Sequence, residues 1–166
     1  MSEVHIDVSL AAQQLSLYQT SDEGDILLHQ FPISTARNGA GESDGSFCTP
    51  RGAHRIAEKI GEGAALFAVF KGRVATGETW TPQLDAEEPG RDWILSRILW
   101  LDGLEAGKNQ GGNVDSHARY IYIHGTNEED KIGTPVSHGC IRMRNADVVT
   151  LFDQVAVDTH VNIRED

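Results

Sequence analysis

The stretch RYIYIHGT, residues 119–126, carries the clearest alternation of side-chain types in this chain. Successive side chains of a β-strand point to opposite faces, so the two tyrosines and the histidine would share one face and the two isoleucines the other. We predict a strand over Arg119–His124, with His124 at its end. Gly125 then allows the chain to leave the strand sharply.

A second motif follows at Ser137–Arg142, with the sequence SHGCIR. Its cysteine is a candidate nucleophile, but a free thiol has a pKa of about 8.5 and needs a base or an electropositive surrounding. Two histidines compete for the role of base: His138, two residues before Cys140, and the more distant His124. We favour His124, because catalytic partners meet in space and a separate strand can present it across a cleft.

The N-terminal half predicts short strands joined by turns. Alternating apolar residues and the turn-rich residues 21–25 indicate a three-stranded meander. Residues 37–46, rich in Gly, Asn and Asp, are expected to form a loop. The predicted strands are His5–Leu10, Gln14–Tyr18, Ile26–Ile33, His54–Ile60 and Leu66–Phe70.

Residues 77–113 contain all three tryptophans and many glycines and prolines, and their pattern is harder to interpret. Arg91–Leu101 is apolar almost all round, and its shortness favours a strand. The tryptophans either fill the core, which is the interpretation we favour, or form an aromatic wall or lid over a cleft.

The C-terminal region predicts one helix and a last strand. Asn145 is a candidate N-cap, with Asp147 in the first turn. Apolar residues then recur at helical spacing, which indicates an amphipathic helix of about ten residues. Thr159–Ile163 would close the chain as a strand.

Many short strands with one clear helix predict a mainly β protein, a β-sandwich or small mixed barrel with one or two short helices. Residues 1–166 are expected to form a single domain, because this length gives a sufficient core. The net charge of −11 argues against a nucleic-acid partner and against an anionic membrane surface.

No apolar run approaches the ~18 residues that span a bilayer, so membrane insertion is not expected. The N-terminus has neither a basic region nor an apolar segment of a signal peptide. The expected location is therefore the cytoplasm if Met1 is the native start, and the periplasm if the chain was trimmed. The two cysteines are too few for a disulfide scaffold, and a Cys48–Cys140 bridge would consume the nucleophile.

The motif IHGT followed by SHGCIRM resembles the catalytic signature of the L,D-transpeptidases, the YkuD-type cysteine enzymes of peptidoglycan metabolism. The resemblance covers nearly all of the chain, because Val8–Tyr18, Phe31–Thr35 and Thr49–Gly52 look like that family's opening strands and loop. One position departs from part of the family, in which Asn stands two residues after the cysteine. This chain has Arg142 there, as another branch does.

The resemblance implies acyl transfer through a thioester on Cys140, with His124 as the base. The imidazole would be oriented by the backbone carbonyl of Gly125. The oxyanion would be bound by backbone N–H groups of His138, Gly139 and Cys140. The family uses no organic cofactor and no metal.

Four further residues are candidates for substrate binding: Arg142, Ser137, Tyr122 and Arg119. Arg142 could clamp a carboxylate or stabilise the thiolate, or it could form a salt bridge that holds the loop. For Arg119 and His117, solvent exposure is the default expectation. A metal site from His117, His124, His138 and Cys140 is the competing hypothesis, but the spacing of zinc motifs is absent.

The substrate implied by the resemblance is a peptidoglycan-derived tetrapeptide or muropeptide, cut between the third residue, often diaminopimelate, and the terminal D-alanine. Water as acceptor gives an L,D-carboxypeptidase, and an amine gives a cross-linking transpeptidase. We favour the carboxypeptidase, acting on recycled muropeptides, because an export signal is missing. Covalent inhibition by a carbapenem is also expected.

An inactive wall-peptide-binding module and a papain-like endopeptidase are competing hypotheses for the function of the domain.

Overall fold

The computed structural model describes residues 3–166, which form ten strands and two α-helices. The strands are β1 Val4–Ser9, β2 Gln14–Gln19, β3 Ile26–Ser34, β4 Gly52–Ile60, β5 Ala68–Lys71, β6 Val74–Thr79, β7 Ile94–Gly103, β8 Tyr122–Gly125, β9 Ile141–Met143 and β10 His160–Arg164. The α-helices are α1 Pro82–Glu87 and α2 Asn145–Gln154, and two single-turn 3₁₀ helices span Gly112–Val114 and Glu129–Lys131.

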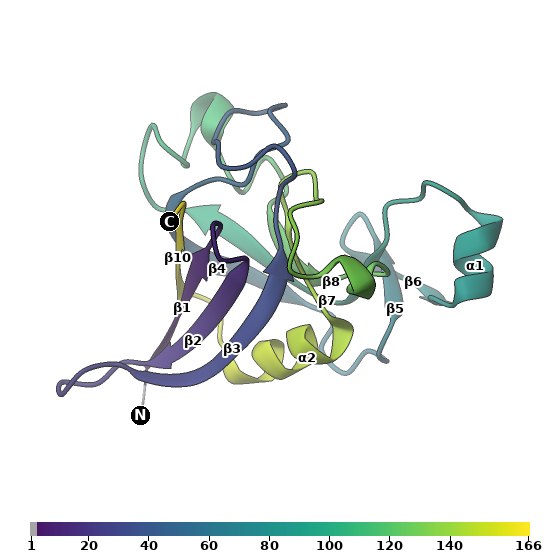
Figure 1. The fold of residues 1–166 in the computed structure, drawn as a ribbon, viewed down its shortest axis with the longest axis horizontal. Coiled ribbons are helices and arrows are strands. Elements are labelled where there is room, and N and C mark those ends of the chain that lie inside the picture. The colour runs from purple at the N-terminus through teal and green to yellow at the C-terminus, as the bar shows by residue number, and fades with distance from the viewer. Residues whose placement is uncertain (1–2) are drawn as a thin grey trace.

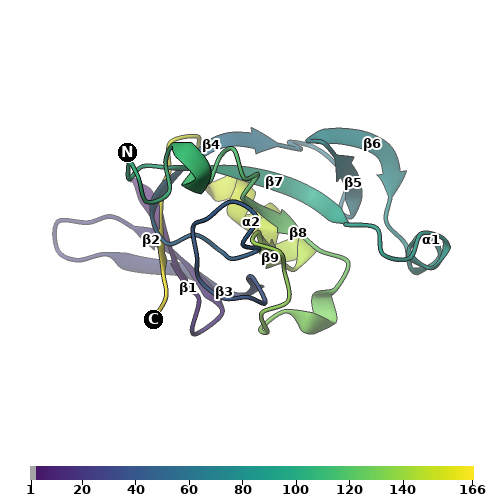
Figure 2. The ribbon, with the colours of Figure 1, turned by 90° about the horizontal axis from the view of Figure 1, so that it is seen from above.

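The strands hydrogen-bond in the order β4-β10-β1-β2-β3-β9-β8-β7-β5-β6, and β4 also pairs with β7. This last pairing closes the first eight strands of that order into a barrel and leaves β5 and β6 outside it. The prediction of a mainly β chain with one or two short helices is confirmed, and the barrel is the form that it takes (Figures 1 and 2).

The predicted meander is present, because β1, β2 and β3 pair antiparallel in sequence order. The C-terminal strand β10 then runs parallel to β1 and antiparallel to β4, so the two ends of the chain are joined in one sheet. Residues 37–46 form a loop as expected.

The main core fills the inside of this barrel with alternate side chains of its strands. Ile6, Leu15, Ile33, Ile123 and Ile141 have no exposed surface. Helix α2 lies along the lower side of the barrel in Figure 1 and adds Val148, Leu151 and Phe152 to the same cluster. Over residues 3–166, no helix has the length and apolar character needed to cross a membrane.

The segment 68–93 forms an arm beside the barrel, extending to the right in Figure 1. Its strand β6 and helix α1 were not predicted. The β5–β6 turn consists of Gly72 and Arg73, both with positive φ, which suits a two-residue hairpin. Thr81 caps α1 by accepting a hydrogen bond from the Leu84 N–H, and a proline occupies the first turn.

Trp93 and Trp100 are strongly buried in hydrophobic clusters, whereas Trp80 is half-buried beside one of them, so the favoured interpretation holds for two of the three tryptophans. Trp93 packs with Val69 and Leu95 where the arm meets β7. Trp100 belongs to a second cluster, on the outer face of the barrel, against which Cys140 packs. The predicted strand Arg91–Leu101 is present as β7, shifted toward the C-terminus.

Two local predictions were wrong. The strand predicted over Arg119–His124 begins only at Tyr122, because residues 115–120 form turns in which Tyr120 has a φ of 57°. Tyr120 therefore does not share a strand face with His124. Asn145 is the first residue of α2 rather than its N-cap, which is Arg144, and the Asn145 amide bonds to other segments.

Candidate active site

The candidate site lies on the outer face of the parallel β8–β9 ladder. His124 pairs in register with Arg142, and Ile123 pairs with Ile141. Because side chains alternate, the isoleucines enter the barrel core, while His124 and Arg142 face outward. Cys140 precedes β9 by one residue, so it lies on the same outward face, diagonal to His124. The predicted nucleophile and base thus lie on the same face of the β8–β9 ladder, while the hydrogen bonds of the Cys140 thiol go to the backbone of Tyr120 and Tyr122 and not to His124.

Backbone groups of the β8 segment hold the thiol of Cys140. The Tyr122 N–H donates to Sγ over 3.4 Å, and the thiol donates to the Tyr120 carbonyl over 3.3 Å. Burial raises the pKa of Cys140 to about 11, while the Tyr122 N–H, Arg142 and Arg119 act in the opposite direction. The resting cysteine is therefore a neutral thiol at neutral pH, and it needs a base when it attacks.

His124 is 2% exposed, and its Nδ1 lies 2.7 Å from the carbonyl oxygen of Gly125. A carbonyl only accepts, so Nδ1 carries the proton and Nε2 is the basic nitrogen. Burial lowers the pKa of His124 to about 4, which keeps the imidazole neutral. The carbonyl predicted to orient the imidazole is thus in hydrogen-bonding position.

The turn after His124 requires glycine. A Cβ built on Gly125 would lie 2.4 Å from Oδ1 of Asn145 and 2.6 Å from the Leu95 carbonyl oxygen. Any larger residue would displace the backbone whose carbonyl holds the imidazole.

The loop before Cys140 is braced by hydroxyl groups. Ser137 is 1% exposed; its hydroxyl donates to the Cys140 carbonyl at 2.6 Å and accepts from the Gly139 N–H at 3.2 Å. Thr49 donates to the Gly139 carbonyl at 2.9 Å. Ser137 therefore bonds to neighbours in its own motif and presents no open surface to a substrate.

Gly139 has a φ of 132°, and a Cβ there would lie 3.1 Å from the Cys48 carbonyl oxygen. Both the conformation and the close approach favour glycine. Its N–H would have to leave the Ser137 hydroxyl before it could bind an oxyanion.

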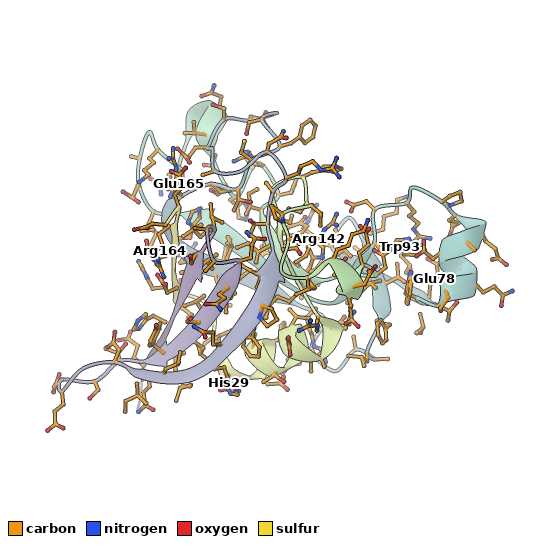
Figure 3. All side chains as sticks on the ribbon, in the orientation of Figure 1. His29, Glu78, Trp93, Arg142, Arg164 and Glu165 are labelled. Carbon is orange, nitrogen blue, oxygen red and sulfur yellow. The ribbon has the colours of Figure 1, made fainter. Side chains whose placement is uncertain are left out.

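Arg142 is 12% exposed and forms an ion pair of 3.1 Å with Glu128, while the Asp92 carboxylate lies 4.0 Å away. This contact matches the salt-bridge interpretation. Arg142 and Trp93 line a cleft of about 390 Å³ where the arm meets the barrel, and Figure 3 shows both side chains there. The cleft also contains four carboxylates and two further cations: Asp85, Asp92, Glu128, Asp130, Arg91 and Lys131.

Arg119 is half-buried, contrary to the default expectation. Its guanidinium donates to the carbonyls of Cys48 at 2.8 Å and Glu42 at 3.1 Å. Burial lowers the pKa of Arg119, and its positive charge acts on the Cys140 thiol. Arg119 therefore ties the 41–48 loop to the turns that precede β8, and its shortest hydrogen bonds go to protein carbonyls.

An aromatic cluster borders Cys140 on the other side. Tyr122 is 5% exposed, and its hydroxyl accepts a hydrogen bond of 3.0 Å from Arg73 of the arm. Arg73 also lies over the ring of Trp100, 4.8 Å from its centroid. His117 stacks on Trp100 with the two ring centroids 3.9 Å apart, so it is half-buried and not exposed as expected.

The remaining candidate residues form no hydrogen bond with the thiol of Cys140 within the described part of the chain. His138 is exposed, and its ring meets Phe47 edge-on at 5.5 Å. Cys48 and Cys140 are both free thiols, so they form no disulfide bridge with each other. Within residues 3–166, no three His, Cys, Asp or Glu side chains converge in a geometry that could hold a metal ion.

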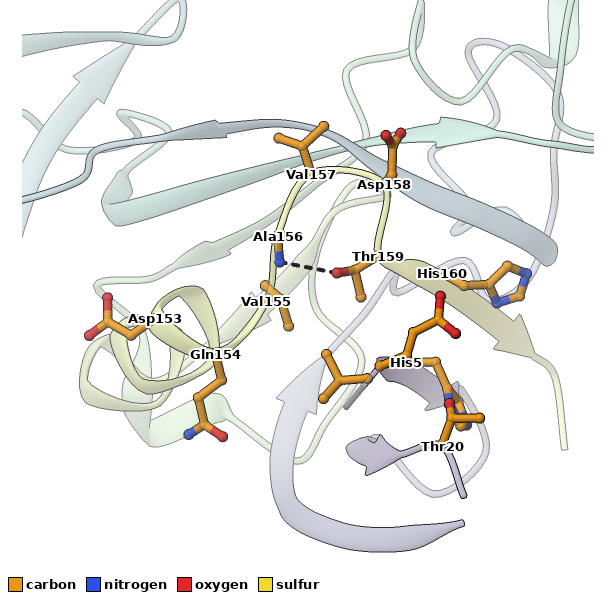
Figure 4. Close-up of a pocket in the computed structure, with 12 residues that line it drawn as sticks. His5, Thr20, Asp153, Gln154, Val155, Ala156, Val157, Asp158, Thr159 and His160 are labelled. Carbon is orange, nitrogen blue, oxygen red and sulfur yellow. Dashed lines mark hydrogen bonds between the residues drawn. The ribbon is translucent and has the colours of Figure 1, made fainter. Parts of the chain in front are cut away.

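A second and larger cavity, of about 900 Å³, is separate from this site. Figure 4 shows that it lies between the start of β1 and the connection from α2 to β10. Its lining includes His5, Thr20 and His160, whereas neither Cys140 nor His124 contributes to it.

Comparison with known proteins identifies the family of the chain. The profile of the YkuD L,D-transpeptidase catalytic domain matches residues 3–163. The chain therefore belongs to the L,D-transpeptidase catalytic domain family.

Two similar proteins are named as members of this family. The "Probable L,D-transpeptidase YbiS" of Escherichia coli (strain K12) is 34% identical over 94 residues, 49% of this chain and 31% of that protein. The "Probable L,D-transpeptidase ErfK/SrfK" of Salmonella typhimurium is 34% identical over 100 residues, 53% of this chain and 32% of that protein. This chain thus covers about a third of the length of these relatives.

Solved structures share the fold. The cell shape determining protein Pgp2 from Campylobacter jejuni superposes with a TM-score of 0.62 at 16% identity, over 99% of this chain and 48% of that one. L,D-transpeptidase 3 from Mycobacterium tuberculosis gives a TM-score of 0.58 at 14% identity, over 99% of this chain and 62% of that one.

Several residues around the site were not found from the sequence. Asp92 comes from residues 77–113, whose pattern was hardest to interpret, and Arg73 comes from the β5–β6 turn before them. Ser96 and Asn145 act through contacts between distant segments. For Arg73, the sequence offered one local signal of a role near the site, which is its positive charge in a two-residue turn.

Proposed function

We propose that this domain is a cysteine acyltransferase that forms a thioester with peptidoglycan stem peptides through Cys140. The observation that carries the proposal is the outward face of the β8–β9 ladder. There the thiol of Cys140 lies diagonal to His124, whose Nδ1 is bonded to the Gly125 carbonyl. Membership of the L,D-transpeptidase family supports the same chemistry.

In the proposed reaction, Nε2 of His124 takes the proton as Sγ of Cys140 attacks the peptide carbonyl. The tetrahedral intermediate then collapses, and the imidazolium returns the proton to the leaving amine of D-alanine. The thioester is resolved when an acceptor attacks it and His124 removes the acceptor's proton; the second tetrahedral intermediate expels Sγ of Cys140, which takes this proton back from the imidazolium. Because both groups rest in the neutral form, proton transfer accompanies the attack.

Water is the acceptor that we favour, which makes the enzyme an L,D-carboxypeptidase that releases D-alanine from stem tetrapeptides or muropeptides. Cys140 is half-buried and is flanked by the exposed residues His138 and Tyr120, so solvent reaches the surroundings of the thiol.

One observation favours a second candidate, a cross-linking transpeptidase. The cleft beside Arg142 carries four carboxylates and three cations, so one negative charge is in excess, and the exposed carboxylate of Asp92 would attract the ammonium group of an amine acceptor.

The test is the intact mass of the protein after brief exposure to a disaccharide tetrapeptide, for the wild type and for Cys140→Ala. The wild type should gain the mass of the acyl group, and the variant should gain none. Free tripeptide and D-alanine identify hydrolysis, whereas dimers without free tripeptide would replace the carboxypeptidase by the transpeptidase. A wild type that is acylated neither by the tetrapeptide nor by a carbapenem would contradict the proposal.

A further inference from the structure

The structure contains a buried amide directly behind the base. Asn145, the first residue of α2, has no exposed surface. Its Oδ1 accepts a hydrogen bond of 2.7 Å from the Ser96 hydroxyl of β7. Its Nδ2 donates to the Thr126 carbonyl at 2.8 Å and to the Glu129 carboxylate at 2.9 Å. Two segments of the chain, β7 and residues 126–129, therefore meet at this one side chain.

These contacts surround the peptide that orients His124. The Gly125 carbonyl accepts from Nδ1 of His124, and the next carbonyl, that of Thr126, is held by Asn145. The Asn145 amide also lies close to Gly125 itself, because a Cβ there would lie 2.4 Å from Oδ1. The backbone at residues 125–126 is thus fixed by contact at one residue and by a hydrogen bond at the next.

The amide is itself held rigidly. Both Nδ2 hydrogens are used, and the Asn145 backbone N–H donates to the same Glu129 oxygen at 2.7 Å. Ser96, buried and at a φ of 71°, also accepts from the Phe67 N–H at 2.9 Å. A fully satisfied buried network of this kind specifies one arrangement, because any shift leaves a buried polar group without a partner.

We propose that Asn145 is a positioning residue for His124: by fixing the Gly125–Thr126 backbone, it aims the Gly125 carbonyl at Nδ1 and so keeps Nε2 as the basic nitrogen. The kinetic part of this inference rests on the proposed function. Without the amide, the carbonyl is free to turn, and the imidazole loses the hydrogen bond that selects its tautomer.

The decisive measurement is the imidazole nitrogen spectrum of His124, recorded by long-range proton–nitrogen correlation at neutral pH and assigned with His124→Gln. The wild type should show one neutral tautomer with the proton on Nδ1. In Asn145→Ala the two nitrogen signals should move toward each other as the tautomers mix. Acylation of Cys140 by the tetrapeptide should slow about tenfold or more, as when partners that orient metal-binding histidines are removed.

The matched control is Asn109→Ala. Asn109 is also fully buried, donates to the Arg51 and Ala53 carbonyls at 3.0 Å each, and accepts from the Glu105 N–H at 2.9 Å. None of these hydrogen bonds involves a residue of the Gly125–Thr126 backbone that follows His124. This variant should lose thermal stability as Asn145→Ala does, but keep the wild-type His124 signals and acylation rate.

Unchanged His124 signals in Asn145→Ala, with a loss of stability equal to that of Asn109→Ala, would overturn the inference. If Asn145→Ala does not fold, Ser96→Ala removes the donor to Oδ1 together with the acceptor of the Phe67 N–H, and a smaller shift of the His124 signals in the same direction is expected; no shift there would also overturn the inference. A wild type that is never acylated would refute the proposed function and leave the spectrum to decide the role of Asn145.

Discussion

The two faces of the β8–β9 ladder share one backbone but differ completely in their surroundings. On the inner face Ile123, Ile141 and Met143 have no exposed surface and pack in the apolar cluster of the barrel core. On the outer face the same strands present His124 and Arg142, with Cys140 directly before them, among hydrogen-bond donors, ions and aromatic rings.

This contrast explains how a reactive group can be held precisely on two short strands. The inner face anchors the ladder, because apolar burial in a closed barrel leaves little freedom for the backbone. The outer face can then carry polar side chains whose burial costs stability. The inner face is expected to determine stability and the outer face to determine reactivity.

The largest expected effect is a loss of turnover in a variant that separates reactivity from stability. Cys140→Ala should lower the rate of tetrapeptide turnover by about 10⁴-fold or more, because the nucleophile is removed. Its free energy of unfolding should stay within about 1 kcal/mol of the wild type, since the side chain is small and half-buried. Turnover and denaturant unfolding of the same sample test both statements. Residual turnover within about tenfold of the wild type would mean that another group is the nucleophile.

The next largest effect is expected on the inner face. Ile123→Ala should lower the free energy of unfolding by about 3 kcal/mol, because it removes a fully buried side chain and leaves a cavity. Urea unfolding is the measurement. The matched control is Ile26→Ala, which changes an isoleucine that is 52% exposed and should cost less than about 0.5 kcal/mol. Equal losses in the two variants would contradict the assignment of Ile123 to the core.

Acid should destabilise the protein through His124. Its pKa is lowered from 6.5 to about 4 in the folded protein, so between these values the unfolded chain binds the proton and the folded protein does not. The free energy of unfolding therefore falls as pH decreases through this window, by about 3 kcal/mol at pH 4 from this group alone. Denaturant unfolding across the window should show a shallower slope for His124→Gln. An unchanged slope would show that the buried imidazole does not account for the acid sensitivity.

The smallest expected effects concern the charges around the thiol. Arg142 lowers the pKa of Cys140 and Asp92 raises it. Arg142→Gln should therefore shift the pH dependence of Cys140 alkylation by iodoacetamide to higher pH, and Asp92→Asn to lower pH. Each change in rate at fixed pH should be about twofold and should weaken with added salt, because Asp92 is 74% exposed.

The opposite signs of these two shifts form an internal control. Shifts of the same sign would mean that the variants act by moving the loop and not by charge. Alkylation that is already at its plateau at neutral pH would contradict the neutral resting thiol.

Local patterns predicted the elements whose faces differ clearly in polarity. The alternation in RYIYIHGT predicted a strand ending at the histidine, and β8 ends one residue later, at Gly125. It failed at Tyr120, because residues 115–120 turn so that the Arg119 side chain can reach the carbonyls of Glu42 and Cys48. β6 was missed because it lies outside the barrel and lacks a buried face, so its sequence shows no alternation.

The sequence by itself determined most of the barrel strands, the helix after the cysteine, and the two motifs that carry Cys140 and His124, because these depend on residue type and short spacing. Only the tertiary structure decided that Asn145 braces the histidine turn rather than capping α2, and that Arg142 meets Glu128. Closure of the barrel brings together residues that are far apart in the chain, such as Ser96 and Asn145. Contacts of that kind depend on the position of every strand between them, and no local pattern encodes them.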